Sequence, residues 1–221
     1  SYQLNSVVDD ILDFSRMEAN KLDLEHVSFN IVDVLENVIS LHSPLAQEKN
    51  LELVLQHASD LPPSILGDSF RISQIFSNLV SNAIKFTESG TITVSADAVV
   101  MNNQSIRLQI NVKDTGAGLT VDAQERLFDA FSQADNAVAR KYGGSGLGLA
   151  IVRKLIEQMN GFINVKSSDV EGTEFTVYLD LQLDKSKRYE VLKSFTVADD
   201  TSCARKNMHN LINDDNHVKS K

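Results

Sequence analysis

A glycine-rich segment at residues 143–149, Gly-Gly-Ser-Gly-Leu-Gly-Leu, stands directly before a stretch with helical periodicity. Because glycine has no Cβ atom, backbone N–H groups here can approach an anion closely, and the positive end of the helix dipole adds to the attraction. The segment lacks the lysine of a P-loop, and Ile151 occupies the place of the last glycine in the dinucleotide-binding fingerprint. The pattern predicts a polyphosphate cradle of a different kind, with a flexible turn as the alternative.

A second element is the sequence Asp-Thr-Gly-Ala-Gly at residues 114–118, directly after a predicted strand that ends at Lys113. A carboxylate at a strand end can accept a hydrogen bond from the exocyclic amine of a base, and the glycines would let a flat ring approach the backbone. Taken alone, the same residues also fit an ordinary hairpin or loop.

The third element is a predicted helix that carries Asn78, Asn82 and Lys85. Offsets of four and three residues place these side chains on one helix face, about 5–6 Å apart. Asparagine is a poor helix former, so two of them on one face need an explanation. Amide oxygens suit a hard cation such as Mg²⁺, and lysine suits a phosphate. A hydrated polar face is the simpler alternative, but the three elements together favour a nucleotide site.

Hydrophobic periodicity predicts the elements that must position these groups. Helices are predicted over residues 27–50, 69–86 and 147–159, the last with Gly161 as its C-terminal cap. Strands are predicted over residues 51–57, 91–100, 105–113, 162–168 and 173–183, and residues 116–146 are interpreted as a long mobile segment. Helices and mostly antiparallel strands in this order predict an α+β fold, a two-layer α/β sandwich.

Composition narrows the function further. The 221 residues are 42% hydrophobic and 23% charged, which is typical of a globular chain, and the net charge of -9 argues against nucleic acid as a partner. The single cysteine, Cys203, excludes a disulfide framework and favours a reducing compartment, the cytoplasm. We expect no membrane segment, because no apolar run approaches about 18 residues, and no signal peptide. Since the first residue is Ser1, we interpret the sequence as a piece of a longer protein.

Four motifs, in this order, resemble the N, G1, F and G2 boxes of sensor histidine kinases, which have the Bergerat-type (GHKL) ATP-binding fold. They are Asn-Leu-x-x-Asn-Ala-x-Lys-Phe-Thr at 78–87, Asp-x-Gly-x-Gly at 114–118, Phe-x-x-Phe at 128–131 and Gly-x-Gly-Leu-Gly-Leu at 144–149. The resemblance covers residues 1 to about 184. Residues 9–18 are similar to the end of the dimerization helix of hybrid-type members, and Gly67, Asp68 and Arg71 match the usual sequence before the N box.

The resemblance implies a division of the chain into four parts. Residues 1–22 would be the end of the dimerization helix, 23–184 the catalytic ATP-binding domain, 185–194 a linker, and 195–221 the start of a truncated receiver domain or a disordered acidic tail. The apolar stripe of the first part needs a partner; packing on its own domain is the alternative to a bundle seam.

The family's site residues map onto this sequence by motif. The residues that would act in catalysis are Asn78, Asn82 and Lys85, and the two asparagines would hold Mg²⁺ on the triphosphate of ATP. Asp114 would bind the adenine amino group, and Arg140 and Lys141 would reach the phosphates from a lid. The full set of implied ATP contacts is Asp114, Gly116, Gly118, Phe131, Arg140, Lys141, Gly144, Gly146, Leu147, Gly148 and Thr173. Ala117 and Ser145 depart from the usual residues without changing this chemistry.

The same resemblance implies a protein histidine kinase of two-component phosphorelay signalling. Related gyrase-type ATPases carry a water-activating glutamate where this chain has Asn78, which cannot act as a base. The γ-phosphoryl group would pass to a histidine outside this chain, because His42 and the other four histidines lack the acceptor context; the chain should not autophosphorylate. Two alternatives are an ATP-binding regulatory module that transfers nothing and a gyrase-type ATPase.

The implied partners are a histidine-bearing dimerization domain, homodimeric in the parent protein, and a response-regulator receiver domain. The sequence leaves open whether that parent is anchored in the inner (plasma) membrane, and it does not identify the stimulus or the cognate receiver.

Overall fold

The computed structural model describes residue 15, residues 23–130, residues 146–184 and residue 186. The chain divides into two compact units, residues 1–189 and 190–221, and every described residue belongs to the first. The elements of that unit are β1 (Val27–Phe29), α2 (Ile31–Glu48), β2 (Leu51–His57), β3 (Ile65–Gly67), α3 (Ser69–Phe86), β4 (Gly90–Asn102), β5 (Ser105–Asp114), α4 (Val121–Glu125), α6 (Gly148–Gln158), β6 (Phe162–Ser168) and β7 (Gly172–Leu183).

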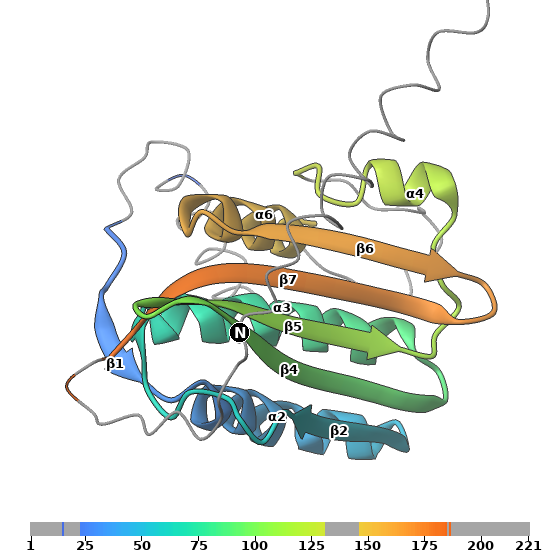
Figure 1. Ribbon diagram of the computed structural model, residues 1–221. Coiled ribbons are helices and arrows are strands. Elements are labelled where there is room, and N and C mark those ends of the chain that lie inside the picture. Colours follow the sequence, from blue (N-terminus) through green and yellow to red (C-terminus); the bar gives the residue numbers. More distant parts are fainter. Residues whose placement is uncertain (1–14, 16–22, 131–145, 185, 187–221) are drawn as a thin grey trace, which may run out of the picture. The chain divides into compact units, whose positions relative to one another are not determined.

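The strands form one seven-stranded sheet in the order β1-β3-β7-β5-β4-β2, with β6 also paired to β7 (Figure 1). All pairs are antiparallel except β2 with β4. One edge of β7 pairs with β5 along its length, and the other edge is shared by β6 and, at its last residues, by β3. The β5–β7 register runs from Ser105 opposite Gln182 to Lys113 opposite Glu174. It therefore brings the end of β5 beside the start of β7.

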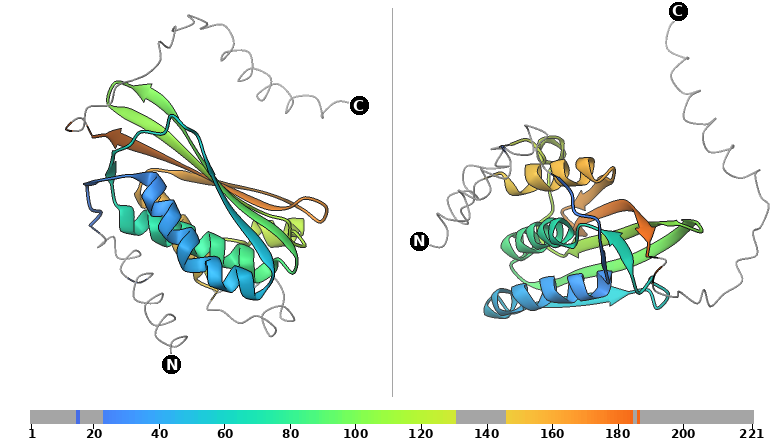
Figure 2. Two further views of the ribbon diagram at one scale, coloured as in Figure 1. Left: turned by 90° about the horizontal axis from the view of Figure 1, so that it is seen from below. Right: turned by 90° about the vertical axis from the view of Figure 1, so that its left-hand side faces the viewer.

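Helices α2, α3 and α6 cover one face of the sheet, and Figure 2 shows the two layers edge-on. Strand β5 shows why the layers form: its even-numbered residues from 106 to 112 are buried, while Arg107 and Lys113 alternate with them on the other face. The fully buried residues of α3 recur at helical spacing and pack in the same core; they are Ile72, Ile75, Phe76, Leu79, Val80 and Ile84. The predicted α+β two-layer sandwich is confirmed.

The structure corrects the prediction at the start of the domain. Residues 27–29, predicted as helical, form strand β1, and α2 begins at Ile31 because Asn30 is its N-cap, with Oδ1 accepting a hydrogen bond from the Val32 N–H at 3.0 Å. Strand β3 was not predicted, because three residues are too few to show a hydrophobic period. The predicted helix at residues 1–22 and the linker and tail beyond 184 lie outside the described residues, apart from Ser15 and Ser186.

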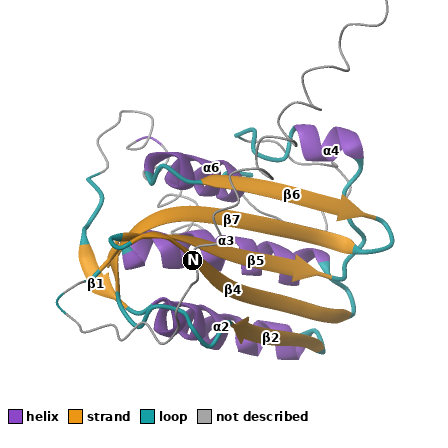
Figure 3. Ribbon diagram, viewed as in Figure 1, coloured by secondary structure: helices purple, strands orange, loops and turns teal. Residues whose placement is uncertain are grey.

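Two further corrections concern turns. The short helix α4 lies inside the segment that was predicted to be mobile, and it begins where the Thr120 side chain accepts from the Ala123 N–H. The left-handed residue after α6 is Asn160 (φ 55°), not Gly161. Glycine is required at 161 for a different reason, because a Cβ there would lie 2.4 Å from the carbonyl oxygen of Tyr178. Figure 3 shows α4 as a helix between two loops.

The end of β7 is joined to the start of the domain by a carboxylate. Asp184 accepts hydrogen bonds from the hydroxyls of Ser28, Ser64 and Ser186 and from the Ser186 N–H. These bonds lower the pKa of Asp184 to about 2, with the Ser186 hydroxyl as the largest cause. Of the helices in the described ranges, none is long and apolar enough to cross a membrane.

Candidate functional site

Helix α3 holds the asparagine and lysine side chains at one side of the core. It begins at the N-cap Asp68, whose Oδ1 accepts from the Arg71 N–H at 2.9 Å, and it ends where the Thr87 N–H and hydroxyl both donate to the Ala83 carbonyl. The group Asn78, Asn82 and Lys85 lies on its half-buried side. Within the described part of the chain, no protein group is hydrogen bonded to either asparagine side chain, so both amides can accept a ligand.

The last turn of α3 is fixed by Lys49, the residue that follows α2. The Lys49 ammonium donates to the carbonyl oxygens of Ile84 and Lys85, at 2.7 and 3.0 Å. A cation at the C-terminal end of a helix is favoured by the helix dipole. Lys85 itself lies with its ammonium 4.9 Å from the ring centre of Phe86, and burial lowers the pKa of Lys85.

Asp114, the last residue of β5, is 5% exposed and is held by two backbone groups. Its Oδ1 accepts hydrogen bonds from the N–H groups of Gly116 (2.8 Å) and Thr173 (3.3 Å). Burial raises the pKa of Asp114, and these two hydrogen bonds act in the opposite direction. No group among the described residues bonds to Oδ2. The carboxylate is therefore oriented by one oxygen and can accept from a ligand with the other.

Strand β7 pairs with β5 on one edge and with β6 on the other, and this pairing brings Thr173 next to Asp114. Its hydroxyl lies 2.8 Å from the Ser167 hydroxyl, and Ser167 also accepts from the Leu119 N–H at 2.8 Å. Ser167 thereby ties the loop after Asp114 to the start of β7. The sequence reasoning missed Ser167, since only the strand register, which pairs it with Thr173, brings it here.

The glycines after Asp114 are required by the packing of the loop itself. Gly118 has a φ of 71°, and a Cβ there would lie 2.1 Å from the Ser168 carbonyl oxygen. At Gly116 a Cβ would lie 2.8 Å from the carbonyl oxygen of Phe86, the last residue of α3. The loop after β5 and the end of α3 are thus in direct contact, which the sequence could not show.

The glycine-rich segment meets α3 at the first turn of α6. A Cβ on Gly148 would lie 3.3 Å from Oδ1 of Asn78, so the absence of a side chain lets the start of α6 approach this amide. Gly146 has a φ of 71°, and Leu147 is buried in the core. The expected contacts Phe131, Arg140, Lys141 and Gly144 lie outside the described residues.

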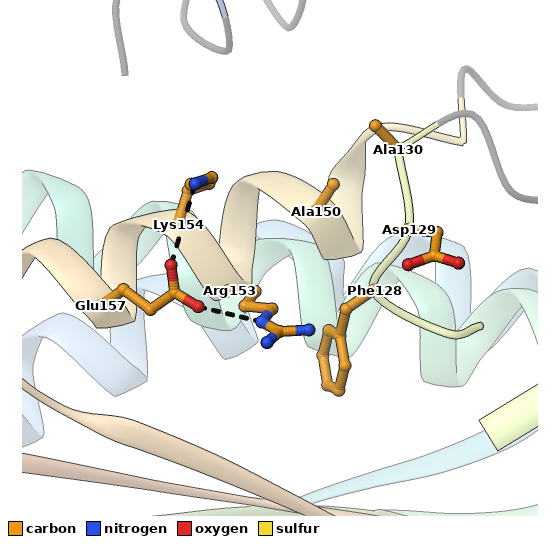
Figure 4. A pocket seen from close by; sticks show the side chains of 7 residues that line it. All are labelled: Phe128, Asp129, Ala130, Ala150, Arg153, Lys154 and Glu157. Atoms are coloured by element: carbon orange, nitrogen blue, oxygen red, sulfur yellow. Dashed lines mark hydrogen bonds and ion pairs between the residues drawn. The ribbon is translucent and has the colours of Figure 1, made fainter. Parts of the chain in front are cut away.

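A hollow of about 240 Å³ lies between α6 and residues 128–130 (Figure 4). Glu157 pairs there with Arg153 at 2.9 Å and with Lys154 at 3.9 Å, and the Arg153 guanidinium lies 5.9 Å from the ring centre of Phe128. Phe128, the first residue of the Phe-x-x-Phe motif, and Ala150 in the first turn of α6 line it, whereas the side chains of α3, Asp114 and Thr173 do not. The hollow is therefore separate from the group formed by α3 and Asp114.

Two other groups were considered for chemistry. In the described ranges, no cluster of three or more His, Cys, Asp or Glu side chains could hold a metal, so a cation at this site would need ligand oxygens besides the asparagine amides. His42, which resembled a phosphoacceptor most, is half-buried in α2, and its Nε2 lies 2.8 Å from the Ser77 hydroxyl. Burial lowers the pKa of His42.

Comparison with known proteins agrees with this geometry. Residues 67–183, more than half of the chain, match the family described as histidine kinase-, DNA gyrase B-, and HSP90-like ATPase. The chain is 47% identical over 178 residues to the sensor histidine kinase GacS of Pseudomonas protegens, covering 80% of this chain and 19% of GacS. It is 41% identical over 180 residues to the signal transduction histidine-protein kinase BarA of Escherichia coli K12, and the match covers 81% of this chain and 20% of BarA.

Among solved structures, the crystal structure of full-length ShkA in complex with AMPPNP matches with a TM-score of 0.70 and 36% identity, over 82% of this chain and 36% of ShkA. The chain spans about a fifth of the length of the curated relatives it matches. Both the matched residues and the arrangement of α3, Asp114 and α6 lead to one conclusion: the chain belongs to the family of histidine kinase-, DNA gyrase B-, and HSP90-like ATPases.

Proposed function

We propose that this chain is the catalytic domain of a sensor histidine kinase, which binds Mg²⁺-ATP and donates the γ-phosphoryl group to a histidine on a dimerization domain. The observation that carries the proposal is Asp114, buried and oriented by Gly116 and Thr173 through Oδ1, with Oδ2 able to accept from the adenine amino group. The relative ShkA was solved with an ATP analogue, AMPPNP, which supports a nucleotide in the same fold.

The other site residues have roles that follow from their chemistry. Asn78 and Asn82 supply amide oxygens for Mg²⁺ together with the triphosphate, and Lys85 supplies positive charge to a phosphate. Gly146 and Gly148 lie at the N-terminal end of α6, where backbone N–H groups favour an anion. Thr173 fixes the adenine side by donating its N–H to Asp114. Arg140 and Lys141 are proposed to contact phosphates, and Phe131 to anchor the segment that carries them.

Transfer, rather than hydrolysis, is the activity that these residues support. An asparagine at position 78 cannot take a proton from water, and its amide lies against the start of α6. The bound Mg²⁺ would neutralise charge on the phosphates, while the protein holds the γ-phosphoryl group in line with its acceptor. We therefore expect ATP to be held with slow hydrolysis until a histidine is presented.

The proposed partners are the histidine-bearing dimerization domain of the parent protein, which would be a homodimer, and a response-regulator receiver domain. Relatives at 41–47% identity are named sensor or signal transduction histidine kinases, and another relative is named a hybrid signal transduction histidine kinase. We propose a cytoplasmic location for this domain.

Calorimetric titration with AMPPNP, with and without Mg²⁺, tests the nucleotide site, and transfer of labelled γ-phosphate to a supplied dimerization domain tests the activity. A dimerization domain whose histidine is replaced by alanine is the matched control. Magnesium-dependent binding and transfer to the histidine alone are expected. Binding without transfer would favour the regulatory module, steady phosphate release without an acceptor would favour an ATPase, and no binding by a folded chain would overturn the proposal.

A further inference from the structure

Asp68 is a buried carboxylate that uses its two oxygens for two separate parts of the chain. Oδ1 accepts from the Arg71 N–H at 2.9 Å and so caps helix α3. Oδ2 accepts from the backbone N–H of Glu25 at 3.1 Å. Asp68 is 4% exposed, whereas Glu25 is exposed and lies in the segment that leads into β1. One side chain therefore links the beginning of the described domain to the start of α3.

Strand pairing explains why these residues meet. β1 is antiparallel to β3, with Val27 opposite Gly67, and β3 runs directly into Asp68. In an antiparallel pair, residues that precede one strand lie beside residues that follow the other, so Glu25 is brought next to Asp68. The contact joins residues 43 positions apart.

We propose that Asp68 is a positioning residue that couples the segment entering the domain to the orientation of α3, and so to the nucleotide site; the link to nucleotide rests on the proposed function. Helix α3 is the element that carries Asn78, Asn82 and Lys85. At 1.5 Å per residue, Asn82 lies about 21 Å along the helix from Asp68. A packed helix moves as a unit, so a displacement at its capped end is transmitted to these side chains.

The alternative is that Asp68 only caps the helix. The two interpretations can be distinguished by experiment, because the hydrogen bond between Asp68 and the Glu25 N–H can be removed while the hydrogen bond that caps α3 is kept. Glu25→Pro deletes the N–H donor, and Glu25→Ala is the matched control, since it removes the exposed side chain and keeps the donor. Asp68→Asn is the complementary change: asparagine caps a helix about as well as aspartate, but its NH₂ group cannot accept from Glu25.

The first measurement is calorimetric affinity for AMPPNP with Mg²⁺, using the full 221-residue chain. If the Glu25 bond holds α3 in its binding position, Glu25→Pro should bind at least threefold more weakly than Glu25→Ala, because part of the population would have α3 displaced. Asp68→Asn should show a similar loss. The double variant should lose no more than either single variant, because both remove the same hydrogen bond.

The second measurement does not depend on nucleotide. The side-chain amide NMR signals of Asn78 and Asn82 should shift in Glu25→Pro and in Asp68→Asn but not in Glu25→Ala, although neither asparagine is near the substituted residues. Amide hydrogen exchange of Glu25 should be at least tenfold faster in Asp68→Asn than in the wild type.

The outcomes separate this proposal from the proposed function. Equal affinity of Glu25→Pro and Glu25→Ala, with unmoved Asn82 signals, would overturn the coupling and leave Asp68 as a cap. If the folded wild-type chain binds no nucleotide, the proposed function fails, and the asparagine signals alone then decide the coupling to α3. Thermal melting of each variant checks that the domain remains folded.

Discussion

The orientation of Asp114 makes the substitution Asp114→Asn the sharpest test of the adenine assignment. Asparagine has one side-chain acceptor, whereas the site uses two: Oδ1 for the N–H groups of Gly116 and Thr173, and Oδ2 for the ligand. If the asparagine oxygen keeps the hydrogen bonds to the two backbone N–H groups, the asparagine NH₂ group faces the adenine amine, and two donors meet. If the amide is flipped, the NH₂ group instead faces the two backbone N–H donors. Losing one hydrogen bond to a charged group costs about 1.5–3 kcal/mol. We therefore expect AMPPNP affinity to fall by about 10- to 150-fold.

Calorimetry with AMPPNP and with the corresponding GTP analogue measures this effect. Guanine carries an acceptor oxygen where adenine carries the amine, so the asparagine NH₂ should narrow the preference for adenine over guanine. Asp180→Asn is the matched control, because Asp180 lies on β7, is exposed and pairs with Arg107 at 2.7 Å; nucleotide affinity should not change. Unchanged affinity in Asp114→Asn would refute the adenine assignment. Equal losses for both nucleotides, with a lower melting temperature, would show that Asp114 only stabilises the loop.

Three further substitutions test other parts of the site and fold. Asn82→Ala removes one amide oxygen, so Mg²⁺ should increase AMPPNP affinity less than in the wild type; an identical magnesium titration would contradict the metal role. Gly148→Val should lower both AMPPNP affinity and the melting temperature, since even a Cβ lies 3.3 Å from the Asn78 amide and overpacking costs about 1–3 kcal/mol; wild-type values for both would show that α6 can move away. The Asp184 pKa of about 2 lies below its ordinary value of 3.8, so this carboxylate stabilises the fold above about pH 4 and ceases to as pH falls through about 2. The difference in melting temperature between the wild type and Asp184→Asn should shrink over that interval, and a constant difference would contradict this reasoning.

Long periodic segments were predictable because their pattern is local. The sequence predicted α3 with the bounds 69–86, and β2 and β6 with theirs, since each has enough residues to show a hydrophobic pattern. Short elements were not: β1 and β3 have three residues each, too few for a period, and they are strands only because they pair with each other and with β7. The helix predicted from residue 27 instead starts after Asn30, where capping by the asparagine outweighs the apolar pattern.

In the candidate site, too, only the local features were predictable from the sequence. The sequence determined which residue types were present and, within α3, that Asn78, Asn82 and Lys85 share a face, because helical spacing is a local property. Only the tertiary structure decided that Asp114 is oriented by Thr173, 59 residues away, and that Gly148 packs against Asn78. It also showed that Gly116 and Gly118 are required by contacts with other backbone segments. Such contacts depend on strand register and helix packing, which join distant parts of the chain and leave no periodic signal in either part.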